Sequence, residues 1–270
     1  MAVAPESKWT LRNDVYYYTA DSEESVRSGR VELGADLEFL FNFTTLLYKT
    51  DTKIFGGEYA FGAFMPLLGY TDVSSSLKIG NTEAEVEDDQ LGLGDIALIP
   101  WIIYWNKGNF HWSFAEFVVV PTGNYDEDEV ANTGLNYWSF DTNFALTYLN
   151  AETGQDYSFN AGYIINTENS DTNYQTGNEF HLDVSLNQFL SERFALGLQG
   201  FWLKQLSGDS GSGAVLGSNK AEVYGLGPTA LWAAEIDGQP VIFIAKWLHE
   251  FDADNRIEGD HFMASFAVDW

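Results

Sequence analysis

Polar and apolar residues alternate along much of the second half of this chain. The segments 138–148 (WSFDTNFALTY), 157–166 (YSFNAGYIIN) and 180–187 (FHLDVSLN) place aromatic or aliphatic side chains at nearly every second position, with amides, hydroxyls and carboxylates between them. Successive side chains of a β-strand point to opposite faces, so a period of two predicts strands with one apolar and one polar face. The last ten residues, HFMASFAVDW, show the same period and end on an aromatic side chain.

Strand-like segments recur over the whole chain. We predict twelve of them, at residues 9–20, 31–49, 54–71, 91–105, 109–121, 135–150, 155–167, 173–189, 193–206, 220–235, 239–251 and 258–270. Tight connections at 50–53, 106–109, 151–154, 191–193 and 236–239 mostly alternate with longer, acidic or Gly/Ser-rich ones at 21–30, 72–90, 122–134, 168–172, 207–219 and 252–257. This alternation predicts an up-and-down meander, with the tight turns at one end and the long loops at the other.

Such a meander is also compatible with a soluble β-sandwich, whose polar faces meet water. The number and length of the strands, the aromatic residues near strand ends and the two kinds of connection favour a transmembrane barrel. Closure pairs the last strand with the first and leaves no edge in lipid. We therefore predict an all-β fold, a transmembrane up-and-down antiparallel β-barrel of about twelve strands with both termini periplasmic. Residues 1–270 form one domain, with 1–8 as a candidate N-terminal periplasmic extension.

Composition and charge narrow the class of protein. The 270 residues carry a formal net charge of −27, with only 13 Lys and Arg and no Cys. Phosphate contacts need clusters of Lys and Arg, so nucleic-acid binding is excluded. No segment approaches the ~20 apolar residues of a membrane helix, because the strongest, IALIPWIIYW (96–105), is short and contains Pro100. No secretory signal is visible, and the barrel itself indicates the bacterial outer membrane, with the signal peptide removed.

Several short motifs occur in an order that is similar to a known family. They are GLGD (92–95), PTGNY (121–125), NTGLNYWSF (132–140), NTENSDTNYQTG (166–177), QLSGDSG (205–211), GLGP (225–228) and KWLHEFDADNRIEG (246–259). With these motifs the chain resembles, over most of residues 55–270, the outer-membrane family labelled "MetA-pathway of phenol degradation". The resemblance implies a passive outer-membrane channel for small, often hydrophobic or aromatic compounds, and it does not imply an enzyme.

His181, Asp183 and Ser185 supply the residue types of a catalytic relay at alternate positions of one predicted strand. A rise of about 6 to 7 Å per two residues puts His181 and Ser185 roughly 13 Å apart. A relay needs hydrogen-bond contact, so these three residues cannot form one by themselves. We predict that the protein is not an enzyme; an outer-membrane enzyme such as a lipase-like barrel is the alternative.

Metal and cofactor sites have little support in the sequence. The four histidines, at 111, 181, 249 and 261, lie on different predicted strands without the spacing of a metal site. GDSGSG (208–213) lacks the Lys and the following helix of a phosphate-binding loop. We therefore predict no cofactor and no metal. The acidic segments 81–89 and 124–130 are expected to be solvated extracellular loops, with divalent-cation bridging to lipopolysaccharide as the alternative.

Inward-facing residues define the expected channel. By their alternation we expect these side chains to line the lumen: Asp36, Glu38, Phe64, Asp141, Asn143, Asn160, His181, Asp183, Asn187, Lys246 and Glu250. The strands at 54–71, 91–105 and 109–121 are apolar on both faces, so they should give the lumen an apolar wall, unless they pack against a loop or a folded-in N-terminal segment. We predict passive uptake of small hydrophobic or monoaromatic compounds, with a general polar pore or a soluble all-β binding protein as alternatives.

The last strand also predicts how the barrel is assembled. Phe262, Phe266, Val268 and Trp270 lie at alternate positions and end on an aromatic residue, which resembles the assembly signal of bacterial outer-membrane barrels. The expected partners are the barrel assembly machinery, the lipids and lipopolysaccharide of the outer membrane, and a small-molecule substrate. We expect a monomer.

Overall fold

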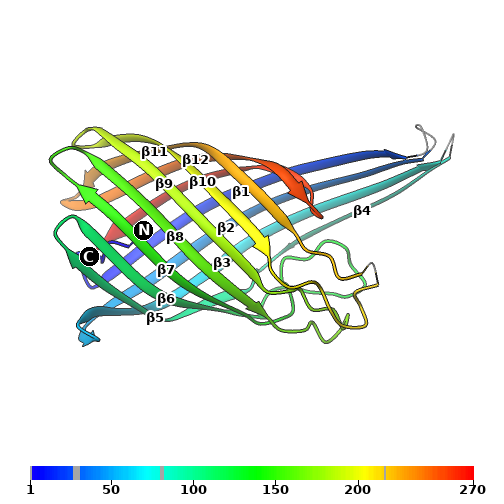
Figure 1. The fold of residues 1–270 in the computed structure, drawn as a ribbon, viewed down its shortest axis with the longest axis horizontal. Coiled ribbons are helices and arrows are strands. Elements are labelled where there is room, and N and C mark those ends of the chain that lie inside the picture. Colours follow the sequence, from blue (N-terminus) through cyan, green and yellow to red (C-terminus); the bar gives the residue numbers. More distant parts are fainter. Residues whose placement is uncertain (1, 27–30, 80–81, 216) are drawn as a thin grey trace.

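The computed structural model describes residues 2–26, 31–79, 82–215 and 217–270, and these residues form strands joined by turns and loops (Figure 1). No helix among them is long and apolar enough to cross a membrane. The strands are β1 (Trp9–Val26), β2 (Val31–Ile54), β3 (Gly57–Ile79), β4 (Thr82–Gly92), β5 (Ile96–Lys107), β6 (Phe110–Val120), β7 (Ser139–Asn150), β8 (Gln155–Asn166), β9 (Glu179–Ser191), β10 (Phe194–Gln205), β11 (Glu222–Ile236), β12 (Gln239–Asp254) and β13 (Glu258–Asp269).

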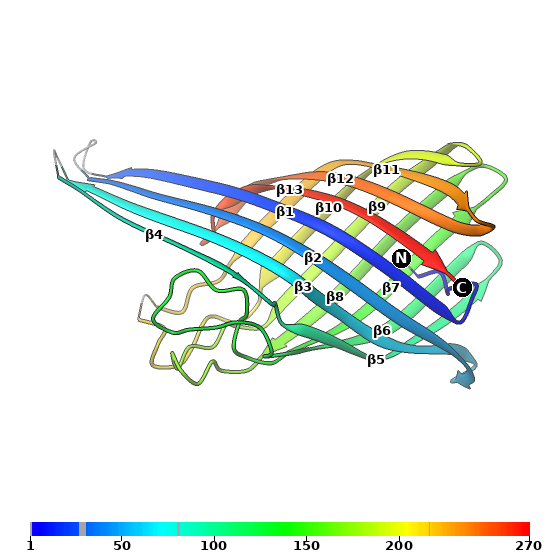
Figure 2. The same ribbon diagram turned by 180° about the vertical axis from the view of Figure 1, so that it is seen from behind.

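Twelve of these strands close into an antiparallel barrel. Each pairs with its neighbours in chain order, except that the barrel neighbour of β3 is β5 and not β4. β13 pairs with β1 and completes the ring. The tight turns lie at one end of the barrel, the turn end, and the longer connections lie at the opposite loop end (Figures 1 and 2). The predicted all-β up-and-down barrel of about twelve strands is confirmed.

The prediction of a loop at residues 72–90 is wrong. β3 continues to Ile79, and β4 returns along it in unbroken antiparallel register from Thr82 to Gly92. The acidic side chains Glu83, Glu85 and Glu87 alternate along β4 on one face and are exposed, so their charge does not oppose strand formation. Asn81, where the acidic segment begins, lies outside the described residues. Together with β1–β3, β4 extends beyond the other strands at the loop end (Figure 2).

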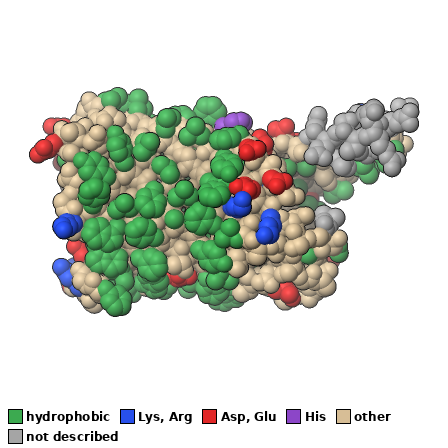
Figure 3. All heavy atoms as spheres, viewed as in Figure 1, with side chains coloured by type: hydrophobic (Ala, Val, Ile, Leu, Met, Phe, Trp, Pro, Cys, Tyr) green, Lys and Arg blue, Asp and Glu red, His purple; other side chains and the backbone are tan. Residues whose placement is uncertain are grey.

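The outer surface of the barrel carries an apolar band between its two ends (Figure 3). Aromatic side chains on neighbouring strands contact one another near each end of this band. At the turn end Trp9 packs on Tyr48 with ring centroids 4.7 Å apart. At the loop end Trp202 packs between Phe180 and Tyr224, with centroids 5.6 and 6.0 Å away. Two aromatic girdles flanking an apolar band are typical of barrels that span an outer membrane.

The N-terminal segment departs from the expectation of a separate periplasmic extension. Both termini lie at the turn end (Figure 1), and the segment before β1 folds into the barrel. Ala2 is fully buried, and its backbone amide donates to the Thr147 hydroxyl on β7 at 3.0 Å. The Lys49 ammonium on β2 donates to the Pro5 carbonyl oxygen. These contacts hold residues 2–5 across the turn end of the lumen.

Candidate channel lumen

A cavity of about 460 Å³ lies inside the barrel beyond the N-terminal segment. Its lining combines aliphatic and aromatic side chains from β2, β3, β5, β6 and β13 with polar side chains from β1 and β2. The lining residues are Thr10, Arg12, Asp14, Tyr16, Phe43, Thr45, Leu47, Phe64, Ile99, Ile102, Tyr104, Phe117, Met263 and Ala267. Much of its wall is therefore apolar, with the charged groups gathered on β1.

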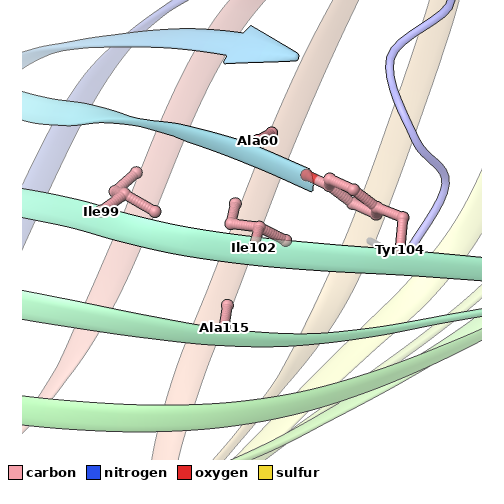
Figure 4. Packing of buried hydrophobic residues seen from close by; sticks show 5 residues of the cluster. All are labelled: Ala60, Ile99, Ile102, Tyr104 and Ala115. Atoms are coloured by element: carbon pink, nitrogen blue, oxygen red, sulfur yellow. The ribbon is translucent and has the colours of Figure 1, made fainter. Parts of the chain in front are cut away.

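The apolar wall is tightly packed where β3, β5 and β6 meet. Ala60, Ile99, Ile102, Tyr104 and Ala115 form one buried cluster (Figure 4). A β-bulge in β5, which places one extra residue against both β3 and β6, breaks the regular alternation here, so that Ile99 and Ile102, three residues apart, both join the cluster. The apolar wall and packing against a folded-in N-terminal segment, which the sequence left as alternatives, occur together, because Ala4 packs against the same cluster.

Aromatic stacking continues the apolar wall onto β2. The rings of Phe43 and Phe64 stack with centroids 4.7 Å apart, and Phe41 stacks on Phe43 at 5.4 Å. Phe43 and Phe64 both line the cavity. A planar ring is the shape that such a wall accommodates best, because offset stacking adds to the gain from burial.

The charged side of the cavity centres on Arg12 and Asp14, which lie two residues apart and so on one face of β1. The guanidinium of Arg12 donates to the Asp14 carboxylate through Nε at 2.8 Å and Nη2 at 2.7 Å. The Ser265 hydroxyl on β13 donates to the same carboxylate oxygen. Asp14 is buried, whereas Arg12 stays partly exposed to the lumen. The pair leaves part of a cation accessible beside the apolar wall.

The opposite half of the lumen is polar and largely satisfied by its own side chains. Asn160 on β8 donates to Asn143 on β7 at 2.8 Å. His181 lies between Asp141 and Asp183, with a ring nitrogen 3.2 Å from a carboxylate oxygen of each. The contacts of Asn160 with Asn143 and of His181 with Asp141 join different strands, whereas His181 and Asp183 share one face of β9.

Nearer the loop end, Glu250 on β12 is fully buried and forms the centre of a further polar cluster. It accepts a hydrogen bond from the Tyr18 hydroxyl at 2.8 Å, and Arg256 Nη2 lies 3.2 Å from it. His261 Nε2 is 3.1 Å from the same carboxylate. A buried carboxylate is costly unless it is paired in this way, so the cluster fixes the junction of β1, β12 and β13.

Nine of the eleven residues expected in the lumen lie on the inner face of the barrel. They are Phe64, Asp141, Asn143, Asn160, His181, Asp183, Asn187, Lys246 and Glu250. The expectation is wrong for Asp36 and Glu38, which are exposed on the outer face of β2. Glu38 pairs with Thr19, the neighbour of inward-facing Tyr18, and the register therefore turns it outward.

Sequence reasoning missed the inner face of β1. Arg12, Asp14 and Tyr16 alternate in the segment RNDVY, and a period of two could have marked them as one face. Nothing in the sequence indicates that this face adjoins Ser265 and Ala267 of the last strand, because that neighbourhood depends on closure of the barrel.

The acidic and Gly-rich motifs build the loop end rather than the lumen. Asp95 of GLGD accepts hydrogen bonds from the backbone amides of Thr122, Gly123 and Leu135 at 2.6–2.9 Å. The predicted strand start at 135–138 therefore belongs to a loop, and β7 begins at Ser139.

The next two loops are joined in the same way. Tyr174 donates to Asp209 at 2.5 Å, and burial followed by this hydrogen bond raises the pKa of Tyr174 to about 12. The backbone amide of Gly177 donates to the other oxygen of the same carboxylate at 3.2 Å. As at the start of β7, the residues before Glu179 belong to a loop rather than to the predicted strand.

A closed antiparallel barrel with an apolar outer band and aromatic girdles defines an outer-membrane-type β-barrel. The sequence belongs, by a match over residues 7–266, to the family described as "Putative MetA-pathway of phenol degradation". No curated protein matches the sequence significantly.

Two solved structures place the fold among bacterial outer-membrane barrels. The chain is similar to the COG4313 outer membrane channel from Pseudomonas putida F1, with a TM-score of 0.68 and 14% identity over 99% of this chain and 97% of that chain. It is also similar to the translocator domain of the autotransporter NalP from Neisseria meningitidis, with a TM-score of 0.50 and 11% identity over 100% of this chain and 91% of that chain. At such identities the likeness concerns the fold alone.

Proposed function

We propose that this protein is an outer-membrane channel through which small apolar or monoaromatic compounds diffuse passively. The observation that carries the proposal is the mixed cavity of about 460 Å³ inside the barrel, walled by stacked aromatic and aliphatic side chains. Its size lies in the range of small-molecule sites, in which apolar burial supplies affinity and a few polar groups set orientation. The family description, which refers to phenol degradation, agrees with such a cargo.

The proposed setting is the bacterial outer membrane, with the turn end and both termini facing the periplasm. The apolar band and the two aromatic girdles support the location in a membrane. The orientation follows the usual architecture of such barrels, in which the long loops face the outside. Membrane lipid, lipopolysaccharide and the barrel assembly machinery are the proposed partners, and a monomer is the proposed state.

We also propose that the protein catalyses no reaction. Ser185, the candidate nucleophile, accepts a hydrogen bond from Asn187 at 3.0 Å, while His181 is engaged by two carboxylates. These contacts support a structural role for the polar row. Among the described residues, no group of three or more His, Asp or Glu side chains is arranged to hold a metal ion.

The test compares influx of phenol and of a small sugar into vesicles containing the purified protein, each corrected for protein-free vesicles. Phenol should enter faster, and Phe64→Asp should slow it by roughly tenfold or more, because an apolar contact worth about 1.5–3 kcal/mol is lost. Phe64→Leu keeps an apolar side chain and should retain most of the flux. Faster sugar entry, or unchanged phenol entry with Phe64→Asp, would leave a general polar pore.

A further inference from the structure

Lys246 is an inward-facing cation that forms no ion pair with the described residues of the wall. It lies on β12 in the middle of the barrel, half-buried, in the same row of the sheet as the cavity residues Met263 and Tyr16. Among the residues that the structure describes, its ammonium makes no hydrogen bond or ion pair. An ammonium has three donors and no acceptor, so it is left with its full capacity to bind an anion.

The carboxylates whose charge acts on the Lys246 ammonium already have other partners. Arg12, Asp14 and Asp183 are the charged groups that act on the ammonium. Asp14 is held by Arg12 and Ser265, and Asp183 lies 3.2 Å from a ring nitrogen of His181. Both carboxylates are thus engaged within the wall, which leaves Lys246, together with the partly exposed Arg12, as cations that face the lumen.

These cations adjoin the aromatic wall. Arg12 lines the cavity directly, with Phe43 and Phe64 beside it on the next two strands, and Lys246 lies one strand beyond Met263. A molecule with a flat apolar body and a single negative group would place its ring on the wall and its charge toward the cations. A neutral molecule would use only the first of these two features.

We propose that Lys246, with Arg12 beside it, forms a carboxylate-binding subsite, and that the preferred cargo is an aromatic carboxylate of the benzoate type. This inference rests on the proposed channel function and narrows its substrate class. The charge of the whole chain, −27, disfavours anions at the rim, so an internal cation is needed if an anionic aromatic is to enter. The positive charge of the subsite offsets, inside the barrel, the repulsion between the acidic protein and an anionic cargo.

Lys246 is also the residue at which the inference can be tested most cleanly. Substituting Arg12 would leave the buried Asp14 carboxylate unpaired and disturb the barrel. Lys246→Met keeps an unbranched side chain of similar length and removes the ammonium, and no described residue loses a hydrogen bond or ion pair. The matched control is Lys204→Met, which removes the same charge at the loop end, where Lys204 pairs with Glu222 at 2.8 Å.

The experiment measures influx of benzoate and of benzyl alcohol into protein-containing vesicles near pH 7, where a carboxylic acid with a pKa of about 4 is ionised. Lys246→Met should reduce benzoate influx about tenfold, as expected for a lost charge-assisted contact, and leave benzyl alcohol influx unchanged. Lys246→Arg should retain most of the benzoate influx, and Lys204→Met should behave as wild type.

The outcomes separate the subsite from the channel itself. If wild-type protein carries benzyl alcohol and Lys246→Met leaves benzoate influx unaltered, the subsite is overturned while the channel function stands. If Lys246→Met changes both fluxes by the same factor, Lys246 affects pore size and the subsite is again overturned. If wild-type protein raises neither flux above that of protein-free vesicles, the proposed channel function fails and the subsite with it.

Discussion

The backbones of Trp9 and Trp270 bond to each other in both directions, with the amide of each donating to the carbonyl oxygen of the other at 3.1 and 2.9 Å. This pair joins the start of the first strand to the end of the chain and completes the ring at the turn end. A barrel in lipid tolerates no unpaired strand edge, and β13 has a partner on each side, β12 and β1.

Phe266→Asp should impair insertion of the barrel. Phe266 lies on the outer face of β13, more than a third exposed at 37%, where lipid offers a carboxylate no partner. Charged side chains in the middle of a barrel's lipid face cost up to about 2–4 kcal/mol, Asp less than Arg or Lys. The measurement is the yield of folded protein that shifts in mobility on heating, with Phe266→Leu as the control. A wild-type yield for Phe266→Asp would contradict the lipid-facing position.

Deleting residues 2–5 should increase single-channel conductance. The segment lies across the turn end of the lumen, held by the contact between Ala2 and Thr147 and by the contact between Lys49 and Pro5. Loss of one such hydrogen bond costs about 1 kcal/mol. Thr147→Val should therefore raise, roughly fivefold, the fraction of channels in which the N-terminal segment has left the lumen. Val3→Ala, at an exposed position, should leave the conductance as it is. Equal conductance for the deletion variant and the wild type would show that the segment does not obstruct the pathway.

Glu250→Leu should lower the stability of the barrel. Removing the carboxylate leaves Arg256 and His261 without their shared partner and breaks the bond to Tyr18. Breaking a buried ion pair by removing one member costs about 3–5 kcal/mol. The temperature at which the folded form is lost on heating should fall clearly, whereas Glu235→Leu, at an exposed turn-end position, should have little effect. An unchanged temperature for Glu250→Leu would contradict the structural role of the cluster.

The contact between Tyr174 and Asp209 should make the loop end sensitive to alkali. The pKa of Tyr174 is raised to about 12 from the ordinary value of 10.0, so the neutral phenol is favoured in the folded loops. The contribution to stability is fully present below pH ~10 and is lost as the pH rises through about 12. Phenolate absorbance and loop proteolysis should both rise in that window. Tyr174→Phe should remove this part of the absorbance change, and a transition complete near pH ~10 would contradict the assignment.

Several parts of this structure could be predicted from the sequence by itself. In β7, β8 and β9 one face is apolar and the other polar, so residues such as Asp141, Asn160 and His181 could be placed together on the inner face before any tertiary information. The alternation of tight turns and long loops determined the direction of each strand. These features are local, because the period of two and the turn residues act within one strand or one hairpin.

Other parts were decided only by the tertiary structure. In β2 both faces are rich in apolar residues, so alternation could not show whether Phe39 or Glu38 faces inward, and pairing with β1 settled it. β4 has the composition of a solvated loop and became a strand because β3 supplies its backbone hydrogen bonds. Arg12 lies beside Ala267 of β13 only because the ring closes. A period of two determines which residues share a face, whereas register and closure determine where that face points and what lies opposite it.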